Sequence, residues 1–399
     1  MRHPLTNSHI KGYLNEWLSE HPEVDVVRFT TFFYHFTLIY NEMKKEKFVD
    51  WFGYSSTLSH EAIQAFEKAK GYPLKAEYVV DEGYFNNPFR IPTKEFLDFL
   101  DFQSEFVCRE AKVLVDMTHD HKKEAMMFLG DNWIGTEPYG KYFEAIGIDS
   151  VVGSVGNGTT LRMISDIPGV KYTEGRFLPY FFPDVFCEEG DPVTEAKENW
   201  IQGRRAIMQS PLDRIGYGGY LSLALQFPEF VDVVERISNE FHTFHEMVQG
   251  TKGYKAPFKV AILNCFGKLR SWQTNQVAHA LWYKEIYSYV GVLEALSGMM
   301  FDVEFINFED IKQNGISEEI GIMINSGDAM TAWSGGENWL DETVITTIRE
   351  WVYNGGGFIG IGEPTAIQHQ GKYFQLFDVL GVDTVSYTHL RAHETLRHL

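Results

Sequence analysis

An aspartate just past an apolar run is the residue best placed to do chemistry. The run Ala125–Leu129 predicts a buried strand, and Asp131 opens the segment Asp131-Asn132-Trp133-Ile134-Gly135-Thr136-Glu137-Pro138-Tyr139-Gly140. Barrel enzymes carry catalytic carboxylates at this position, past the carboxyl end of a strand. Such a carboxyl could act as a general acid if burial against Trp133 or neighbouring acids raised its pKa. Asp131 could equally cap the helix that follows, and the spacing alone does not decide between the two.

Two further acids lie near this segment. Asp116 closes Val113-Leu114-Val115, which we interpret as another strand, so acids recur at predicted strand ends. A helix cap or a supporting group is the better explanation for Asp116. Glu137 could tune the pKa of the acid or bind a substrate hydroxyl. Pro138 directly after it indicates a helix start, which favours a structural role.

Three other patterns do not support a different chemistry. Thr118-His119-Asp120-His121 has metal-binding side chains, but no third ligand lies at a plausible spacing, so we expect a polar loop. Ser59 lacks the Gly-x-Ser-x-Gly turn of a serine hydrolase and is expected to cap a helix that begins at His60. The glycines at 355–362 fail the dinucleotide fingerprint, because Thr365 stands where a third glycine belongs. We therefore predict no metal site and no organic cofactor.

Composition narrows the class of protein. The 399 residues predict two or three domains, and the net charge of −20 argues against a nucleic-acid partner. No apolar run approaches the length of a membrane span, and the start has no signal-peptide core. Three widely spaced cysteines do not form a disulfide framework, so the cytoplasm is the simplest compartment. Aromatic residues make up 15% of the chain, which suits packing against sugar rings, although core packing accounts for most of them.

The order of predicted elements indicates an α/β protein with a partial TIM-like barrel followed by a small doubly wound domain. Residues 1–249 form the barrel, 250–257 a linker and 258–384 the second domain. The predicted strands are 24–30, 111–116, 125–130, 148–153, 258–263, 303–306, 320–325 and 357–362. The predicted helices are 8–20, 59–70, 93–109, 138–146, 192–209, 229–248, 275–298 and 340–353.

Both ends of the chain suggest an internal fragment. The first predicted helix leads straight into a barrel strand, so we expect the first strands of the barrel to precede Met1. Residues 385–399 are basic and rich in histidine, in contrast to the acidic chain before them. This tail resembles translated adapter sequence, and we exclude it from the fold. His389 and His393 have the spacing of a helical metal pair, but the tail's composition makes that interpretation the weaker one.

Several segments together resemble one enzyme family. They are Val27–Tyr34, Gly53–Ser55, Asp131–Gly140, Gly175–Asp184 and Gly327–Ala329, within a resemblance that covers most of residues 8–384. The chain resembles the 1,3-β-galactosyl-N-acetylhexosamine phosphorylases of glycoside hydrolase family 112. The resemblance implies a partly broken (β/α)8 barrel, a flavodoxin-like domain and, beyond this chain, a β-rich C-terminal part.

The resemblance also implies a reaction. Inorganic phosphate would cleave lacto-N-biose or galacto-N-biose with inversion, giving α-galactose 1-phosphate and N-acetylhexosamine. Asp131 matches the general acid, and Arg176 and Tyr180 match the phosphate-binding pair; a further phosphate-binding arginine of the family lies upstream of Met1. The positions that match substrate-binding residues are Arg28, Tyr54, Trp133 and Phe182. The competing explanations are ion pairs for the two arginines and core packing for the aromatic residues.

Other functions stay open at this point. A phosphorylase of the same family that acts on galactosyl-1,4-rhamnose would differ only in its acceptor site. A β-galactosidase would need a second carboxylate, for which Asp116, Glu82 and Glu174 are candidates. A carbohydrate-binding fragment without activity is a third alternative. By analogy with related barrel galactosidases, we expect the full-length protein to form a homodimer.

Overall fold

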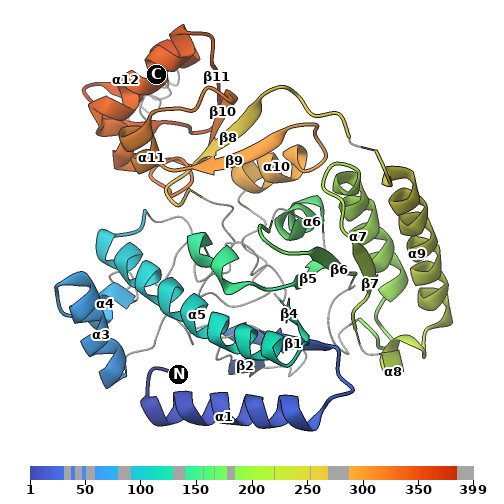
Figure 1. The fold of residues 1–399 in the computed structure, drawn as a ribbon. Coiled ribbons are helices and arrows are strands. Elements are labelled where there is room, and N and C mark those ends of the chain that lie inside the picture. Colours follow the sequence, from blue (N-terminus) through green and yellow to red (C-terminus); the bar gives the residue numbers. More distant parts are fainter. Residues whose placement is uncertain are drawn as a thin grey trace.

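The computed structural model describes twelve segments of the chain, shown in Figure 1. They are residues 1–30, 37–40, 47–50, 59–79, 91–128, 140–155, 157–165, 167–177, 185–219, 221–251, 253–267 and 287–383. The tail at 385–399 lies outside them. Two parallel sheets with flanking helices make up the fold, one in each half of the chain.

The strands of the first sheet have the order and direction of strands in a (β/α)8 barrel. They are β1 (Val26–Thr30), β4 (Glu124–Phe128), β5 (Ser150–Val155), β6 (Tyr172–Phe177) and β7 (Arg214–Tyr217), and they lie side by side in chain order. All four pairings are parallel. Parallel neighbours in chain order are the arrangement of a (β/α)8 barrel, whereas a doubly wound sheet reverses its order. The strands predicted at 24–30, 125–130 and 148–153 are confirmed.

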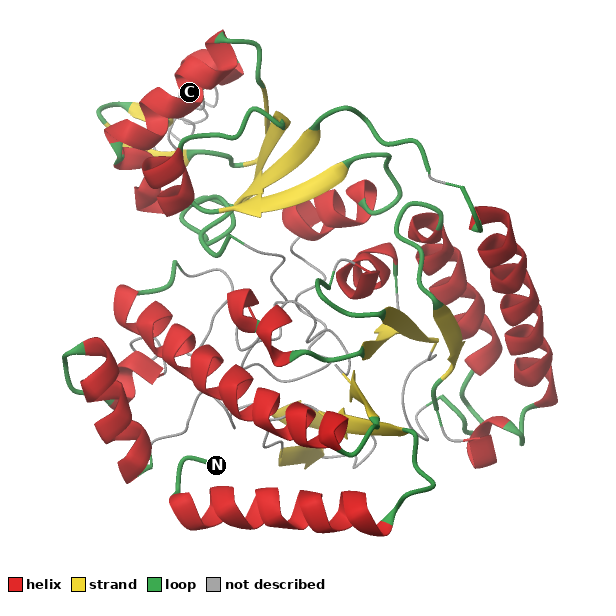
Figure 2. Ribbon diagram, in the orientation of Figure 1, coloured by secondary structure: helices red, strands yellow, loops and turns green. Residues whose placement is uncertain are grey.

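Helices lie around this sheet, some against its strands and others against those helices (Figure 2). They are α1 (Pro4–Glu20), α3 (His60–Lys70), α4 (Ala76–Val79), α5 (Lys94–Asp120), α6 (Gly158–Ser165), α7 (Pro192–Ile207), α8 (Leu221–Ala224) and α9 (Pro228–Val248). Ser59 caps α3 by accepting a hydrogen bond from the backbone N–H of Ala62, as predicted. In place of the helix predicted at 138–146, the described residues form short 3₁₀ turns at Gly140–Tyr142 and Glu144–Ile146. A separate antiparallel hairpin pairs β2 (Thr37–Tyr40) with β3 (Lys47–Asp50).

Strand alternation gives the sheet two unlike faces. Ala125, Met127 and Val151 are fully buried in the core beneath the helices. Met126 and Phe128 alternate with them and are only half-buried. Because successive side chains of a strand point to opposite faces, the second set faces the interior of the barrel. The charged residues of the first sheet lie on this inner face: Arg28, Glu124, Glu174, Arg176 and Arg214.

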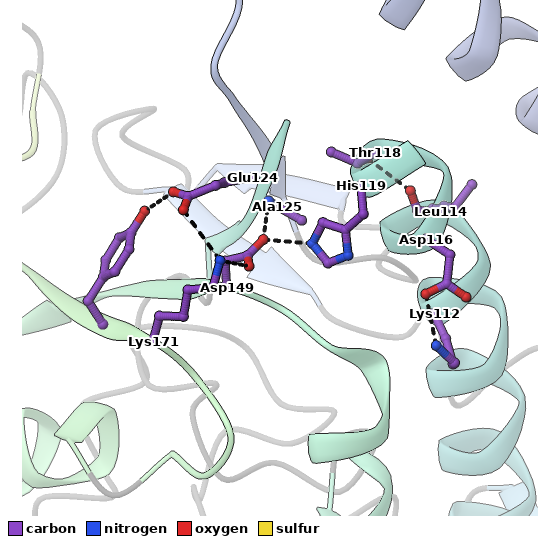
Figure 3. Close-up of polar contacts among 10 residues, drawn as sticks. Lys112, Leu114, Asp116, Thr118, His119, Glu124, Ala125, Asp149 and Lys171 are labelled. Atoms are coloured by element: carbon purple, nitrogen blue, oxygen red, sulfur yellow. Dashed lines mark hydrogen bonds and ion pairs between the residues drawn. The ribbon is translucent and has the colours of Figure 1, made fainter. Parts of the chain in front are cut away.

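The strand predicted at 111–116 is wrong, and Asp116 does not lie at a strand end. Helix α5 runs unbroken for 27 residues through this stretch. Its buried positions include Ala111, Val115 and Thr118, which recur every three or four residues as on one helix face. A three-residue apolar run suits a strand or a helix equally. The spacing of buried residues over the whole of α5 shows that this run is helical. Asp116 is exposed and its Oδ1 lies 2.8 Å from Lys112 Nζ (Figure 3).

The second sheet is doubly wound. Its strands β8 (Lys259–Leu263), β9 (Asp302–Ile306), β10 (Ile320–Gly327) and β11 (Gly357–Gly362) lie in the order β11-β10-β8-β9, all parallel. Read from β9 and numbered by their order in this domain, the strands lie in the order 2-1-3-4, which is the flavodoxin-like arrangement. Around it lie α10 (Tyr287–Leu296), α11 (Phe308–Asn314), η4 (Gly336–Leu340), α12 (Glu342–Tyr353), α13 (Phe377–Leu380) and a hairpin of β12 (Ala366–His369) and β13 (Lys372–Phe374). The glycine run of β11 leads into β12, so it opens no phosphate-binding helix.

One carboxylate joins the two halves. Glu294, on α10, accepts hydrogen bonds from the backbone N–H groups of Gly158 and Thr159 at 3.2 and 3.0 Å, and from the Thr159 hydroxyl at 2.8 Å. Arg205, on α7, also donates to Glu294. The N-terminus of α6 carries unpaired N–H groups and a positive partial charge, which a carboxylate satisfies. The second domain is therefore attached to the chain that follows β5.

Within the described residues, no helix is both long enough and apolar enough to cross a membrane.

Replacing Glu294 with Gln should loosen this attachment. The amide keeps the shape of the side chain but loses the charge that strengthens the hydrogen bonds. We expect the free energy of unfolding to fall by about 1–3 kcal/mol, measured by chemical denaturation. The exposed Glu318→Gln is the matched control, with an expected change below about 0.5 kcal/mol. Equal effects of the two substitutions would contradict the role of Glu294.

Candidate active site

Two predicted site residues meet on the inner face of the first sheet. Arg28 comes from β1 and Arg176 from β6, and both guanidinium groups lie over the ring of Phe128, near the carboxyl end of β4. The distances from Cζ to the ring centroid are 5.7 Å for Arg28 and 4.4 Å for Arg176. The sheet thus brings two cations that are distant in the sequence to one aromatic ring.

The register of the strands explains this meeting. Arg28 pairs with Met126, two residues before Phe128 on the same face. Phe128 pairs with Val152 of β5, and Arg176 pairs with Ser154, two residues further along that strand. Arg28, Phe128 and Arg176 therefore share one face of the sheet. Their side chains gather at its carboxyl edge, which is where barrel proteins bind ligands.

Phe128 holds the arginines by cation–π attraction. The face of an aromatic ring carries negative charge density, and a guanidinium over it gains about 0.5–2 kcal/mol. Arg176 is half-buried, whereas Arg28 is exposed. A planar guanidinium can grip a tetrahedral oxyanion through two parallel N–H groups. Arg176 lies within β6, so its backbone is held by the sheet on both sides.

A second polar layer lies nearer the amino ends of the strands. The guanidinium of Arg214 (β7) is 3.8 Å from the carboxylate of Glu174 and lies over the Tyr172 ring, 4.5 Å from its centroid. The Tyr172 hydroxyl donates a hydrogen bond to the carboxylate of Glu124. That bond, together with burial, raises the pKa of Tyr172. Glu174, one of the candidates for a second catalytic carboxylate, therefore lies next to a cation in this layer.

The other predicted site residues lie outside the described residues. They are Tyr54, Asp131, Trp133, Tyr180 and Phe182, together with Glu82 and Glu137. In the sequence, Asp131 follows Phe128 by three residues and Tyr180 follows Arg176 by four. Phe128 and Arg214 were missed by the sequence analysis. The signal for Phe128 was available, because it is an inward-facing aromatic at the end of the strand that leads to Asp131.

The histidine segment lies at the opposite edge of the sheet (Figure 3). His119 is in the last turn of α5 and His121 caps that helix, so the expected polar loop is wrong: the buried face of α5 extends through Thr118. His119 Nε2 and Lys171 Nζ each lie 2.7 Å from the Asp149 carboxylate, which also accepts the N–H of Ala125 at 2.7 Å. Among the described residues, no group of three or more His, Cys, Asp and Glu could hold a metal ion.

Asp149 fastens the amino ends of β4 and β5. Its side chain is only 6% exposed. Burial alone would raise its pKa, but the N–H of Ala125, Lys171 and His119 together outweigh burial and lower the pKa below the usual range. This edge of a barrel serves stability, so the cluster of Asp149, His119 and Lys171 has a structural role.

The fold is an α/β-barrel domain that carries two arginines at the carboxyl ends of its strands, with a doubly wound domain attached. Residues 1–256 match the family model of the lacto-N-biose phosphorylase N-terminal TIM barrel domain, and residues 259–396 match that of the lacto-N-biose phosphorylase central domain. The chain belongs to the lacto-N-biose phosphorylase family, as the sequence analysis inferred.

Three named relatives are similar to this chain over almost its whole length. A 1,3-β-galactosyl-N-acetylhexosamine phosphorylase of Lachnoclostridium phytofermentans is 59% identical over 96% of the chain and 53% of its own length. The enzyme of that name from Bifidobacterium longum subsp. longum is 52% identical over 96% of the chain and 51% of its own length. A D-galactosyl-β-1→4-L-rhamnose phosphorylase of L. phytofermentans is 38% identical over 96% of the chain and 53% of its own length. The chain spans about half the length of these relatives.

Acid should weaken the fold through Asp149. Because its pKa is lower in the folded than in the unfolded chain, its stabilisation is complete above the unfolded value of about 3.9 and is lost as the pH falls through the folded value. We expect Asp149→Asn to cost about 1–3 kcal/mol at pH 7, with the difference from the unsubstituted protein shrinking below about pH 4. Denaturant unfolding across a pH series measures both.

The exposed Asp116→Asn is the control, because its ion pair with Lys112 is a surface pair on one helix. It should change the free energy of unfolding by less than about 1 kcal/mol at any pH. A difference between Asp149→Asn and the unsubstituted protein that stays constant down to pH 2 would show that the Asp149 charge is not the stabilising feature.

Proposed function

We propose that this chain carries the catalytic barrel of an inverting phosphorylase that cleaves β-1,3-galactosyl-N-acetylhexosamines, lacto-N-biose or galacto-N-biose. The observation that carries the proposal is the pair of arginines over Phe128, at the strand ends of a barrel from this family. Phosphate attacks the anomeric carbon of galactose while the bond to the glycosidic oxygen breaks. The products are α-galactose 1-phosphate and the free N-acetylhexosamine.

The chemistry needs one carboxylic acid and one anion site. Phosphate is already a competent nucleophile, so no base is required to activate water, unlike in an inverting hydrolase. Asp131 donates the proton to the leaving glycosidic oxygen. Arg176 and Tyr180 hold the phosphate in line with the bond that breaks. In a chain with a net charge of −20, a local cation is needed to offset the repulsion of a phosphate dianion.

The sugar is held by the residues around this site. Arg28, Tyr54, Trp133 and Phe182 are the proposed contacts, with the aromatic rings packing on sugar faces and Arg28 donating to hydroxyls. Phosphate is a substrate, and the reaction uses no metal and no organic cofactor. We also propose that the full-length protein is a cytoplasmic homodimer without nucleic-acid or membrane partners.

Two alternatives are less well supported. Relatives named as acting on galactosyl-N-acetylhexosamine share 52% and 59% identity with the chain, against 38% for the galactosyl-rhamnose phosphorylase, which favours the N-acetylhexosamine acceptor. For a β-galactosidase, Asp116 is excluded as second carboxylate by its exposed place on α5, and Glu174 faces Arg214. An assay of turnover distinguishes a binding fragment without activity from a phosphorylase and from a β-galactosidase.

The direct test supplies lacto-N-biose with and without phosphate and measures galactose 1-phosphate. We would assay this chain and a version extended to the length of its relatives. Product should form only with phosphate, and Asp131→Asn should lower kcat by about 10²–10⁴-fold. Galactosyl-β-1,4-rhamnose serves as the competing substrate. Free galactose formed at a comparable rate without phosphate would refute the proposal, and faster cleavage of the rhamnoside would reassign the acceptor.

The anion site predicts that Arg176 cannot be exchanged for Lys. A lysine keeps the charge but loses the planar, two-pronged donor and the stacking on Phe128. We expect Arg176→Lys to raise the KM for phosphate about 10–100-fold, equivalent to roughly 1.4–2.8 kcal/mol, with a smaller effect on the KM for the disaccharide. Steady-state kinetics with each substrate varied in turn measures the two constants. An unchanged phosphate KM would remove Arg176 from the anion site.

A further inference from the structure

We propose that Gly218 is a positioning residue for Arg176: the absence of a side chain at 218 leaves the space through which the arginine reaches the site. The inference rests on the proposed function for its kinetic consequence, since Arg176 is the proposed phosphate ligand. Its geometric basis is independent of that function.

The aliphatic stem of Arg176 occupies the space over Gly218. Gly218 directly follows β7, the strand that pairs with β6. A Cβ atom built on Gly218 would lie 1.5 Å from Cγ and 1.8 Å from Cδ of Arg176. Atoms that are not bonded to each other cannot approach so closely. The side chain of Arg176 in this conformation is therefore compatible only with glycine at position 218.

Conformational freedom does not explain this glycine. Its φ is outside the left-handed region, so an L-residue could adopt the backbone conformation. The space taken by Arg176 is the feature that demands glycine. Past Gly218, the guanidinium of Arg176 lies over Phe128, with Cζ 4.4 Å from the ring centroid. Gly218 thus sets where the stem passes, and Phe128 sets where the charged head rests.

Strand β7 contains a matched control, Gly216. Gly216 lies two residues earlier and pairs directly with Arg176 in the sheet. Apart from its two chain neighbours, no atom of the described residues lies within 4 Å of a Cβ atom built on Gly216. The two glycines lie two residues apart next to Arg176, and they differ in whether the arginine fills the space over them. Alanine at 216 should therefore be neutral, while alanine at 218 should displace Arg176.

The displacement should impair phosphate binding more than folding. A methyl group at 218 clashes with a side chain that can rotate away, so the fold has a way to accommodate it. We expect Gly218→Ala to raise the KM for phosphate at least tenfold, and to leave the KM for lacto-N-biose and the thermal midpoint close to those of Gly216→Ala. A residue with a merely structural role would lower the thermal midpoint and change both constants together.

A double substitution tests whether Gly218 acts through Arg176. In an Arg176→Ala background, Gly218→Ala should change the phosphate KM by less than twofold, because the side chain that it displaces is gone. The assays use the version extended to the length of the relatives. Effects that multiply in the double variant would overturn the inference, as would a Gly218→Ala protein with the phosphate KM of the unsubstituted enzyme.

Crystal structures of Gly218→Ala and Gly216→Ala separate this inference from the proposed function. Arg176 should leave the ring of Phe128 only in Gly218→Ala. If Arg176 keeps its place in both variants, the inference fails even where phosphorolysis is observed. If Arg176 moves as expected but the unsubstituted enzyme shows no phosphate-dependent turnover, the positioning role stands and the proposed function fails.

Discussion

The parallel register of β1, β4, β5 and β6 is the constraint on which the candidate site depends. Parallel strands end at a common edge, and side chains two residues apart share a face. This register places Arg28, Phe128 and Arg176 on the inner face near that edge. A slip of one residue in β6 would turn Arg176 toward the hydrophobic core and Gly175 toward the site. The core beneath the helices therefore determines the site, because it fixes which residues point inward.

The two edges of the sheet have divided roles. At the amino ends of the strands, Asp149 is buried and takes hydrogen bonds from a backbone N–H, His119 and Lys171. At the carboxyl ends, Arg28 and Arg176 lie over the ring of Phe128, whose face attracts their charge. Ionic contacts thus stabilise one edge, and cation–π contacts position the two arginines at the other. Glu294 then joins the second domain to the N-terminus of α6, the helix that follows β5.

Much of this organisation could be predicted from local patterns. The alternation of strand-like and helix-like segments predicted a barrel followed by a doubly wound domain, and helices such as α7 and α9 were predicted to within a residue or two. The prediction failed where the apolar signal was short. Val113-Leu114-Val115 suits a strand or a helix equally, and the buried face of α5 that decides it is visible only over the full 27 residues. Strands β6 and β7 were not predicted, because polar inward-facing residues interrupt their apolar pattern.

The amino-acid sequence alone was enough to predict the α/β class, the family, and the residue types suited to an acid and an anion site. These properties are local, or are carried by short segments that can be recognised without coordinates. The assembled fold placed Arg28 and Arg176 over one ring and the stem of Arg176 in the space over Gly218. It also decided that Asp116 faces solvent on a helix. Contacts between strands depend on register and sheet order, and neither is encoded in the spacing of residues along the chain.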